Sequence, residues 1–268
     1  LLNSKERKPT QAEQKQVLIT PKEHISIENI TFSYPNKIDK ALYGVNMSIE
    51  VNKVIGIVGP SGSGKSTFVD ILLGLLEPQN GSLKIDGKII DKSNLRSWQN
   101  NIGFVAQSIF LTEGSIAENI AFGVPYDQVN FDQVYKALKL AHLDELVDSL
   151  EDGINTKVGE RGVQLSGGQR QRIGIARALY YKSEVLVFDE ATSSLDGVSE
   201  KIIMEAINSF SGKKTIILVA HRLSTVQNCD QIYFFNKGKV VDQGTYQELY
   251  ETNELFRNMT ANTPKKED

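Results

Sequence analysis

The stretch VIGIVGPSGSGKST, residues 54–67, decides how the rest of the sequence is interpreted. Residues 54–58 are apolar and rich in β-branched side chains, which predicts a strand buried on both faces. A glycine-rich turn follows, and then the start of a helical segment. This order fits a phosphate-binding loop, in which glycines let backbone N–H groups converge on an anion at the helix N-terminus. The predicted site consists of Gly59, Pro60, Ser61, Gly62, Ser63, Gly64, Lys65, Ser66 and Thr67.

Two side chains of this loop suit the charge of a nucleoside triphosphate. Lys65 would neutralise the β- and γ-phosphates, and the Ser66 hydroxyl would ligate Mg²⁺. The alternative is a glycine-rich turn with a solvated lysine, which the strand before the loop and the helix after it disfavour. A nucleotide with Mg²⁺ is therefore the expected ligand.

Apolar runs elsewhere in the chain predict the fold around this loop. Residues 185–188 and 215–220 are predicted to form two further buried strands, and helical patterns lie between the strands, which indicates an α/β core with a largely parallel sheet. Residues 25–34 and 231–241 predict antiparallel β regions. Residues 108–182 lack comparable strand runs and repeat apolar residues at helical spacing, so we expect a mostly helical lobe inserted into the core.

Composition excludes several classes of function. The 268 residues include 30 basic and 33 acidic side chains, a net charge of −3 that gives no strong attraction to nucleic acid. A single cysteine, Cys229, and three dispersed histidines exclude a disulfide framework and a local metal site of Cys or His. The apolar runs are far shorter than the ~20 residues that span a bilayer. We expect a polypeptide that is soluble by itself in a reducing, intracellular setting.

Two carboxylates, Asp189 and Glu190, follow the apolar run at 185–188 directly. Asp189 could hold magnesium through water, and Glu190 could polarise the water that attacks the γ-phosphate. Alone, these residues fit a buried strand with a solvated acidic cap. Beside a phosphate loop, the catalytic interpretation is favoured.

A third pattern, Leu165-Ser166-Gly167-Gly168-Gln169, precedes a helical segment. Ser166 is a good N-cap, and the glycines leave the first helical N–H groups open. Taken alone, this pattern indicates a capped helix with a flexible entry rather than a second phosphate site.

Together the three patterns resemble the Walker A, signature and Walker B motifs of the ATP-binding cassette (ABC) ATPases, over about residues 24–255. The resemblance implies the ABC ATPase fold, with ATP as substrate and Mg²⁺ as cofactor. It implies the following site residues: Lys65, Gln107, Glu190 and His221 for catalysis, Ser66, Gln107 and Asp189 for the metal, and Tyr34 for stacking on adenine.

The same resemblance implies a second copy of the domain as partner, paired head to tail. Ser166, Gly167, Gly168 and Gln169 would then contact the ATP held by the other copy. The segment Ser194-Leu195-Asp196 resembles the part of the family that crosses this interface.

Two segments, 115–120 and 156–162, resemble parts of exporter-type transporters. They imply a transmembrane domain as partner, on the same full-length chain, and a location at the cytoplasmic face of the cell membrane. Residues 109–111 fit equally a groove for a cytoplasmic helix of that domain or the core of the helical lobe. The interval from Lys65 to Ser166 leaves room for a compact lobe only and carries no heptad repeat, which disfavours the DNA-associated relatives.

Two other functions remain open: the ATPase subunit of an importer, and a nucleotide-gated interaction module with incidental turnover. We expect residues 1–23 to be a linker or arm from a missing transmembrane domain, residues 24–255 to be the ABC ATPase domain, and residues 256–268 to be a C-terminal tail. The chain opens without Met, which suggests a fragment of a longer protein.

Overall fold

The central sheet of the structure, a computed structural model that describes residues 19–35, 37, 39–159, 163–192 and 197–261, has six strands. Their order is β12-β11-β3-β10-β9-β6, and all neighbours are parallel except β11 and β12. The strands are β3 (Val54–Val58), β6 (Ile102–Val105), β9 (Val185–Asp189), β10 (Thr215–Ala220), β11 (Gln231–Asn236) and β12 (Lys239–Gly244). The predicted parallel core is confirmed. Strands β3 and β10 are buried along their whole length, as expected for apolar strands covered on both faces.

A second sheet lies at the N-terminal side of the chain and is antiparallel, as predicted. Its order is β2-β1-β4-β5, with β1 (His24–Phe32), β2 (Leu42–Glu50), β4 (Asn80–Ile85) and β5 (Lys88–Ile89). Along most of β2, buried and more accessible residues alternate, because one face packs on the core and the other faces solvent.

Helix α1 (Lys65–Leu72) follows β3 and packs into the hydrophobic core shared by the two sheets. Helix α2 (Leu95–Gln99) closes this core with Trp98, which is completely buried and donates a hydrogen bond from Nε1 to the Leu72 carbonyl at 2.8 Å. The remaining helices of the core are α7 (Gly197–Asn208), α8 (Tyr246–Thr252) and α9 (Glu254–Ala261).

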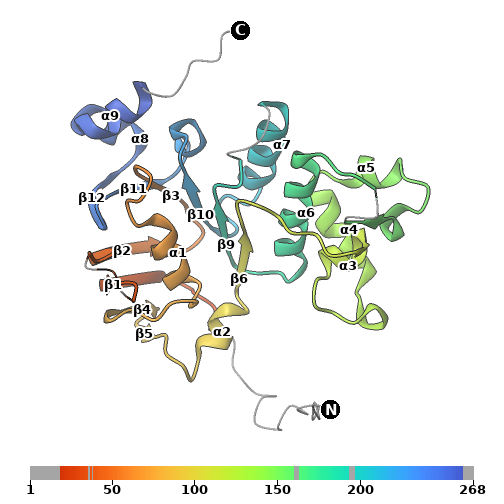
Figure 1. The fold of residues 1–268 in the computed structure, drawn as a ribbon, viewed down its shortest axis with the longest axis horizontal. Coiled ribbons are helices and arrows are strands. Elements are labelled where there is room, and N and C mark those ends of the chain that lie inside the picture. The colour runs from red at the N-terminus through yellow and green to blue at the C-terminus, as the bar shows by residue number, and fades with distance from the viewer. Residues whose placement is uncertain (1–18, 36, 38, 160–162, 193–196, 262–268) are drawn as a thin grey trace.

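The segment between β6 and β9 forms the predicted helical lobe, which extends from one end of the molecule in Figure 1. Helix α6 (Gly167–Tyr180) lies between the sheet and the other helices of the lobe. These are α3 (Ile116–Ile120), α4 (Phe131–Leu140) and α5 (Asp144–Asp148), with the short strands β7 (Gly114–Ser115) and β8 (Lys157–Val158). Short 3₁₀ helices lie at Tyr126–Gln128, Gly153–Asn155 and Leu223–Val226.

The folded part of the chain extends beyond both expected boundaries. Before residue 24, the Asp86 carboxylate accepts hydrogen bonds from the backbone N–H groups of Lys22 and Glu23, and Pro21 is buried. After residue 255, Phe256 in α9 is completely buried against the core. Long-range contacts therefore hold the described parts of these two segments, residues 19–23 and 256–261, against the rest of the domain, although their polar composition alone predicts an arm and a tail. Within the described residues, every helix is too short or too polar to cross a membrane.

Candidate functional site

The phosphate loop connects β3 to α1 and requires glycine at two positions. Gly59 has φ 153°, and a Cβ there would lie 2.1 Å from the Phe235 carbonyl oxygen. Gly64 has φ 102°, and a Cβ there would lie 2.7 Å from the Ala41 carbonyl oxygen. Gly64 is also the N-cap of α1 and offers no side chain to the first helical N–H groups. These N–H groups therefore stay available to an anion.

Lys65 is buried, with 4% of its surface exposed, and its ammonium group points back at the phosphate loop. Its Nζ donates to the carbonyl oxygens of Gly59 at 2.8 Å and Pro60 at 3.1 Å. Burial lowers the pKa of Lys65, and the carboxylates of Glu190 and Asp189 oppose that shift. Phosphate oxygens entering the loop would offer this ammonium group stronger acceptors than neutral carbonyls.

Asp189 ends strand β9 with a carboxylate oxygen that lacks a partner. Its Oδ1 is buried and makes no hydrogen bond within the part of the chain that the structure describes. Burial raises the pKa of Asp189, and the negative charges of Glu190 and Asp70 add to the shift. An unpaired buried carboxylate oxygen and the exposed Ser66 hydroxyl on α1 are the oxygen donors that Mg²⁺ prefers. The residues present therefore fit the expected magnesium ion.

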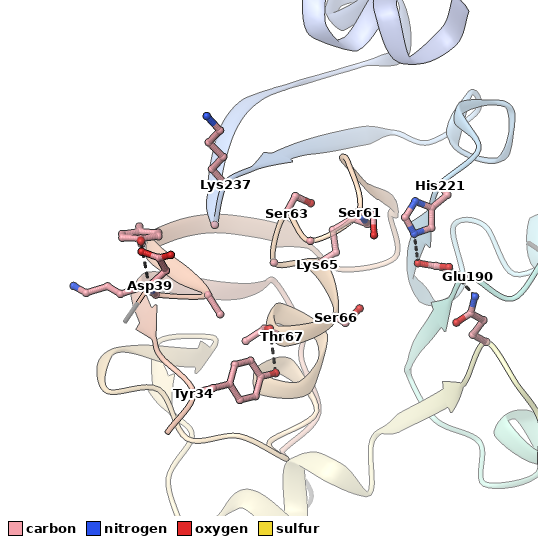
Figure 2. A pocket seen from close by; sticks show the side chains of 17 residues that line it. Tyr34, Asp39, Ser61, Ser63, Lys65, Ser66, Thr67, Glu190, His221 and Lys237 are labelled. Carbon is pink, nitrogen blue, oxygen red and sulfur yellow. Dashed lines mark hydrogen bonds and ion pairs between the residues drawn. The ribbon is translucent and has the colours of Figure 1, made fainter. Parts of the chain in front are cut away.

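Glu190 is held between two of the predicted site residues, of which Figure 2 labels His221 beside it. Gln107 Nε2 donates to Glu190 Oε2 at 2.9 Å, and His221 Nε2 lies 2.5 Å from Glu190 Oε1. Glu190 itself has φ 50°, an unusual value for a non-glycine residue, and its N–H donates to the Val219 carbonyl at 2.9 Å. The parallel strands β6, β9 and β10 end at the same edge of the sheet, which brings these three side chains together.

Tyr34 lies on the other side of the phosphate loop. Its hydroxyl is 3.2 Å from Thr67 Oγ1, and the Phe32 ring packs edge-on against its ring at 5.0 Å. The ring is partly exposed, so one face is available to a flat ligand such as adenine.

A cavity of about 790 Å³ lies between the phosphate loop, Tyr34 and Glu190 and is lined by both predicted and unpredicted residues, whereas the predicted residues Gly59, Pro60 and Asp189 are not in its lining. Predicted lining residues are Tyr34, Ser61, Gly62, Ser63, Gly64, Lys65, Ser66, Thr67, Gln107, Glu190 and His221. Sequence reasoning missed Asp39, Lys40, Ala41, Tyr43, Lys237 and Gly238. They come from the β1–β2 connection, the beginning of β2 (Tyr43) and the β11–β12 turn. In that turn, the Gly238 N–H donates to the Ser63 carbonyl of the phosphate loop at 2.9 Å. The sequence indicates a turn at Lys237-Gly238 between two antiparallel β segments. It gives no indication that this turn contacts the phosphate loop.

The signature residues are not brought to this cavity. Ser166 caps α6: its Oγ accepts from the Gln169 N–H at 3.1 Å, and Gln169 Oε1 accepts from the Ser166 N–H at 2.8 Å. This reciprocal arrangement is a capping box. The N–H groups of Gly167 and Gly168 have no hydrogen-bond partner among the described residues. The site of one chain therefore lacks the signature residues that the resemblance assigns to ATP.

The two segments that resemble exporters lie side by side. Strand β7 pairs with β8 in antiparallel fashion, and the Ile116 N–H donates to the Thr156 carbonyl at 3.0 Å. The rest of the second segment, residues 160–162, lies outside the described residues, as do Ser194, Leu195 and Asp196.

Comparison with known proteins gives one family and several relatives. Residues 42–193, more than half of the chain, match the family model described as ABC transporter. Multidrug resistance protein 1 of Entamoeba histolytica is 42% identical over 254 residues, which cover 93% of this chain and 20% of that protein. An ATP-dependent lipid A-core flippase of Cupriavidus pinatubonensis is 39% identical over 230 residues, which cover 85% of this chain and 39% of that protein.

A solved structure shows the same fold. A bacterial Atm1-family ABC exporter with ATP bound superposes with a TM-score of 0.83 and 33% sequence identity, covering 93% of this chain and 43% of that one. The chain thus spans a fifth to about two fifths of the length of these relatives.

Proposed function

The chain belongs to the ABC transporter family as an ATP-binding domain, and we propose on this premise that it hydrolyses ATP to ADP and phosphate to power export through a membrane domain. The observation that carries the proposal is the position of Glu190. Its carboxylate lies beside the phosphate-loop cavity, held by Gln107 and His221, where a water molecule next to the γ-phosphate would meet it.

The reaction depends on positioning and charge more than on covalent chemistry. Lys65 and the N–H groups of the loop bind the phosphates, and Tyr34 orients the base. Glu190 accepts a proton from the attacking water or orients that water, and Gln107 and His221 fix the carboxylate. Mg²⁺, held by Ser66, Gln107 and Asp189, would neutralise charge on the β- and γ-phosphates. His221 would contact the γ-phosphate once the nucleotide is bound.

We propose that the functional unit contains two copies of this domain paired head to tail. Two observations support the pairing: the cavity of one chain lacks Ser166–Gln169, and the N–H groups of Gly167 and Gly168 at the beginning of α6 have no hydrogen-bond partner among the described residues. A second chain would place this positive helix end against the γ-phosphate in the cavity of the first. ATP binding would then drive association, and hydrolysis would reverse it.

We also propose that the second partner is a transmembrane domain at the cytoplasmic face of the cell membrane. The chain spans only part of its relatives, two of which are named a multidrug resistance protein and a lipid A-core flippase. The helical lobe presents Phe110, with 75% of its surface exposed, and Phe122. Ile109 and Leu111 beside Phe110 pack against the core, so only part of segment 109–111 is available to a membrane partner.

Phosphate release as a function of chain concentration tests this function. If two copies share each ATP, the rate per chain rises with concentration as dimers form. A rate per chain that is constant while the dimer fraction rises would support a nucleotide-gated interaction module instead. A full reading frame with transmembrane helices would support the exporter, and a separately encoded ATPase would support the importer.

A further inference from the structure

Helix α6 and the segment 106–110 are joined at three successive points. The segment follows β6 and contains Gln107, whereas α6 begins at the signature residue Ser166. The three points on the helix are residues 171, 174 and 177, whose spacing of three places them on one face.

The first contact joins Gln171 to the residue before Gln107. Gln171 is buried, and its Nε2 donates to the Ala106 carbonyl at 3.0 Å. The next residue, Gln107, donates to Glu190. Two adjacent residues of the segment therefore attach it to the signature helix and to the catalytic carboxylate, respectively.

The second contact depends on a missing side chain. A Cβ at Gly174 would lie 2.4 Å from Ile109 Cδ1 and 2.7 Å from Ile109 Cγ1, closer than real atoms approach. Glycine therefore lets the segment lie directly on the helix, and Ile109 fills the space.

The third contact uses Arg177 near the end of α6. Its Nη2 donates to the Phe110 carbonyl at 3.1 Å, its Nε donates to the Asn119 carbonyl at 2.8 Å, and its guanidinium lies 4.9 Å from the centre of the Phe122 ring. Asn119 is completely buried and donates in turn to the carbonyls of Thr112 and Ser115. Through Arg177 and Asn119, α6 is therefore attached to residues of the lobe beyond segment 106–110 as well.

From these contacts we infer that Gln171 is a positioning residue for ATP hydrolysis, because its amide attaches the residue before Gln107 to the beginning of α6. Gln171 fixes the beginning of α6 relative to Gln107, so any change that displaces Gln107 from Glu190 also displaces Ser166. The inference rests on the proposed function, because it assigns Ser166 to ATP bound by a second copy.

The test is Gln171→Met in the 268-residue chain, which keeps the volume and removes the donor. We expect kcat to fall about tenfold, and ATP-driven dimerisation in a Glu190→Gln background to weaken about tenfold, as for the loss of one buried hydrogen bond. KM, and the ATP affinity of the monomer measured at low chain concentration, should change by less than about twofold, because the phosphate loop is untouched. Gln133→Met on α4 is the matched control, since its side chain makes no hydrogen bond within the described residues.

A second pair of variants keeps the inference testable if Gln171→Met does not fold. Gly174→Ala should push the segment away from α6 and weaken dimerisation to a similar degree. Adding Ile109→Ala removes the atoms that clash and should restore dimerisation to within about threefold of the parent. Failure of this rescue, in a chain that binds ATP normally, would contradict the inference.

The outcomes separate the inference from the function on which it rests. If the Glu190→Gln chain neither binds ATP nor dimerises, the proposed function fails. If that chain dimerises, and Gln171→Met gives the same dimerisation constant and kcat as Gln133→Met, only the inference is overturned. If Gln171→Met weakens ATP binding by the monomer and dimerisation to the same degree, Gln171 has a general structural role, and the inference is overturned as well.

Discussion

The cavity around the phosphate loop and the exposed beginning of helix α6 both present backbone N–H groups at a helix N-terminus, yet their surroundings differ. At the cavity, Lys65, Glu190 and His221 from three elements surround the space before α1. At α6, the cap is its own capping box, and among the described residues no atom outside the adjoining residues and the helix backbone would lie within 4 Å of a Cβ at Gly167. Under the proposed function, one anion site would be assembled within the chain, and the other would be completed by a second chain.

This difference teaches where each part of the reaction resides. Under the proposed function, binding of the triphosphate and activation of water would use groups that one chain already brings together. Charge stabilisation by α6 would require a second chain. The predictions below test whether the two regions divide the work in this way.

The largest effect is expected for Glu190→Gln, which removes the carboxylate and keeps its shape. Turnover should fall by about 10²–10⁴-fold, the usual contribution of a general base. ATP binding should persist, and the ATP-bound dimer should accumulate because it is not consumed. Phosphate release and sedimentation in the presence of ATP measure both results. Glu145→Gln on the exposed surface of the helical lobe is the control, and parental turnover in Glu190→Gln would refute the assigned role.

Lys65→Ala should have the next largest effect, a loss of affinity for ATP at the cavity of the same chain. The Kd for ATP should rise about 30-fold or more, because the variant loses a buried charge that the phosphates would pair with. Titration calorimetry of the monomer measures it. Lys92→Ala, which removes an exposed lysine 3.1 Å from Glu77, should leave the affinity unchanged. Equal affinities for the two variants would discredit the phosphate-loop assignment.

Ser166→Asp tests the other region without removing the cap, since Asp is also a good N-cap. Its carboxylate would face the γ-phosphate of the partner's ATP, so ATP-driven dimerisation should weaken about tenfold or more. Binding of ATP to the monomer should not change. Thr245→Asp is the matched control, because Thr245 forms the same capping box at α8, away from the cavity. A similar loss of dimerisation in both variants would show that the beginning of α6 has no special role.

The smallest effect concerns the stability of the nucleotide-free cavity. The pKa of Asp189 is raised in the folded chain, so the folded state holds this proton more tightly than the unfolded state. Stability is therefore lost as the pH rises from the ordinary pKa of Asp through the raised one.

Near neutral pH, Asp189→Asn should unfold at a temperature about 2–4 °C higher than the parent, the shift that ~1 kcal/mol produces in a domain of this size. The difference should shrink at acid pH, where Asp189 is protonated. Thermal unfolding followed by circular dichroism at the two pH values measures it. A variant that is less stable than the parent at neutral pH would contradict the cause given for the pKa shift.

The sequence predicted the parts of this molecule that depend on local pattern. Strand β3 and the loop to α1 follow from apolar residues and glycines that are adjacent in the chain. The contact of Glu190 with Gln107 and His221 could be expected only through the family resemblance, because three separate strand ends create it. Its distances and the positive φ of Glu190 come from the structure alone.

Long-range contacts account for what the sequence did not predict. Asp86 holds the backbone at Lys22 and Glu23 from a distant turn, and Phe256 packs against core residues far from it in the sequence, such as Phe234 of β11. Similarly, nothing in the sequence around Gln171 indicates that its amide reaches the Ala106 carbonyl. Such contacts join residues far apart in the chain and leave no periodic signal.

The central claim, that two copies share each triphosphate, is tested most directly by mixing Lys65→Ala and Ser166→Asp chains. Each variant alone should be nearly inactive. In a head-to-tail heterodimer, one of the two sites combines an intact phosphate loop from the Ser166→Asp chain with an intact signature from the Lys65→Ala chain. An equimolar mixture should therefore recover up to about a quarter of the parental rate, since half of the dimers are mixed and each has one intact site. A rate equal to the average of the two separate variants would contradict the shared site.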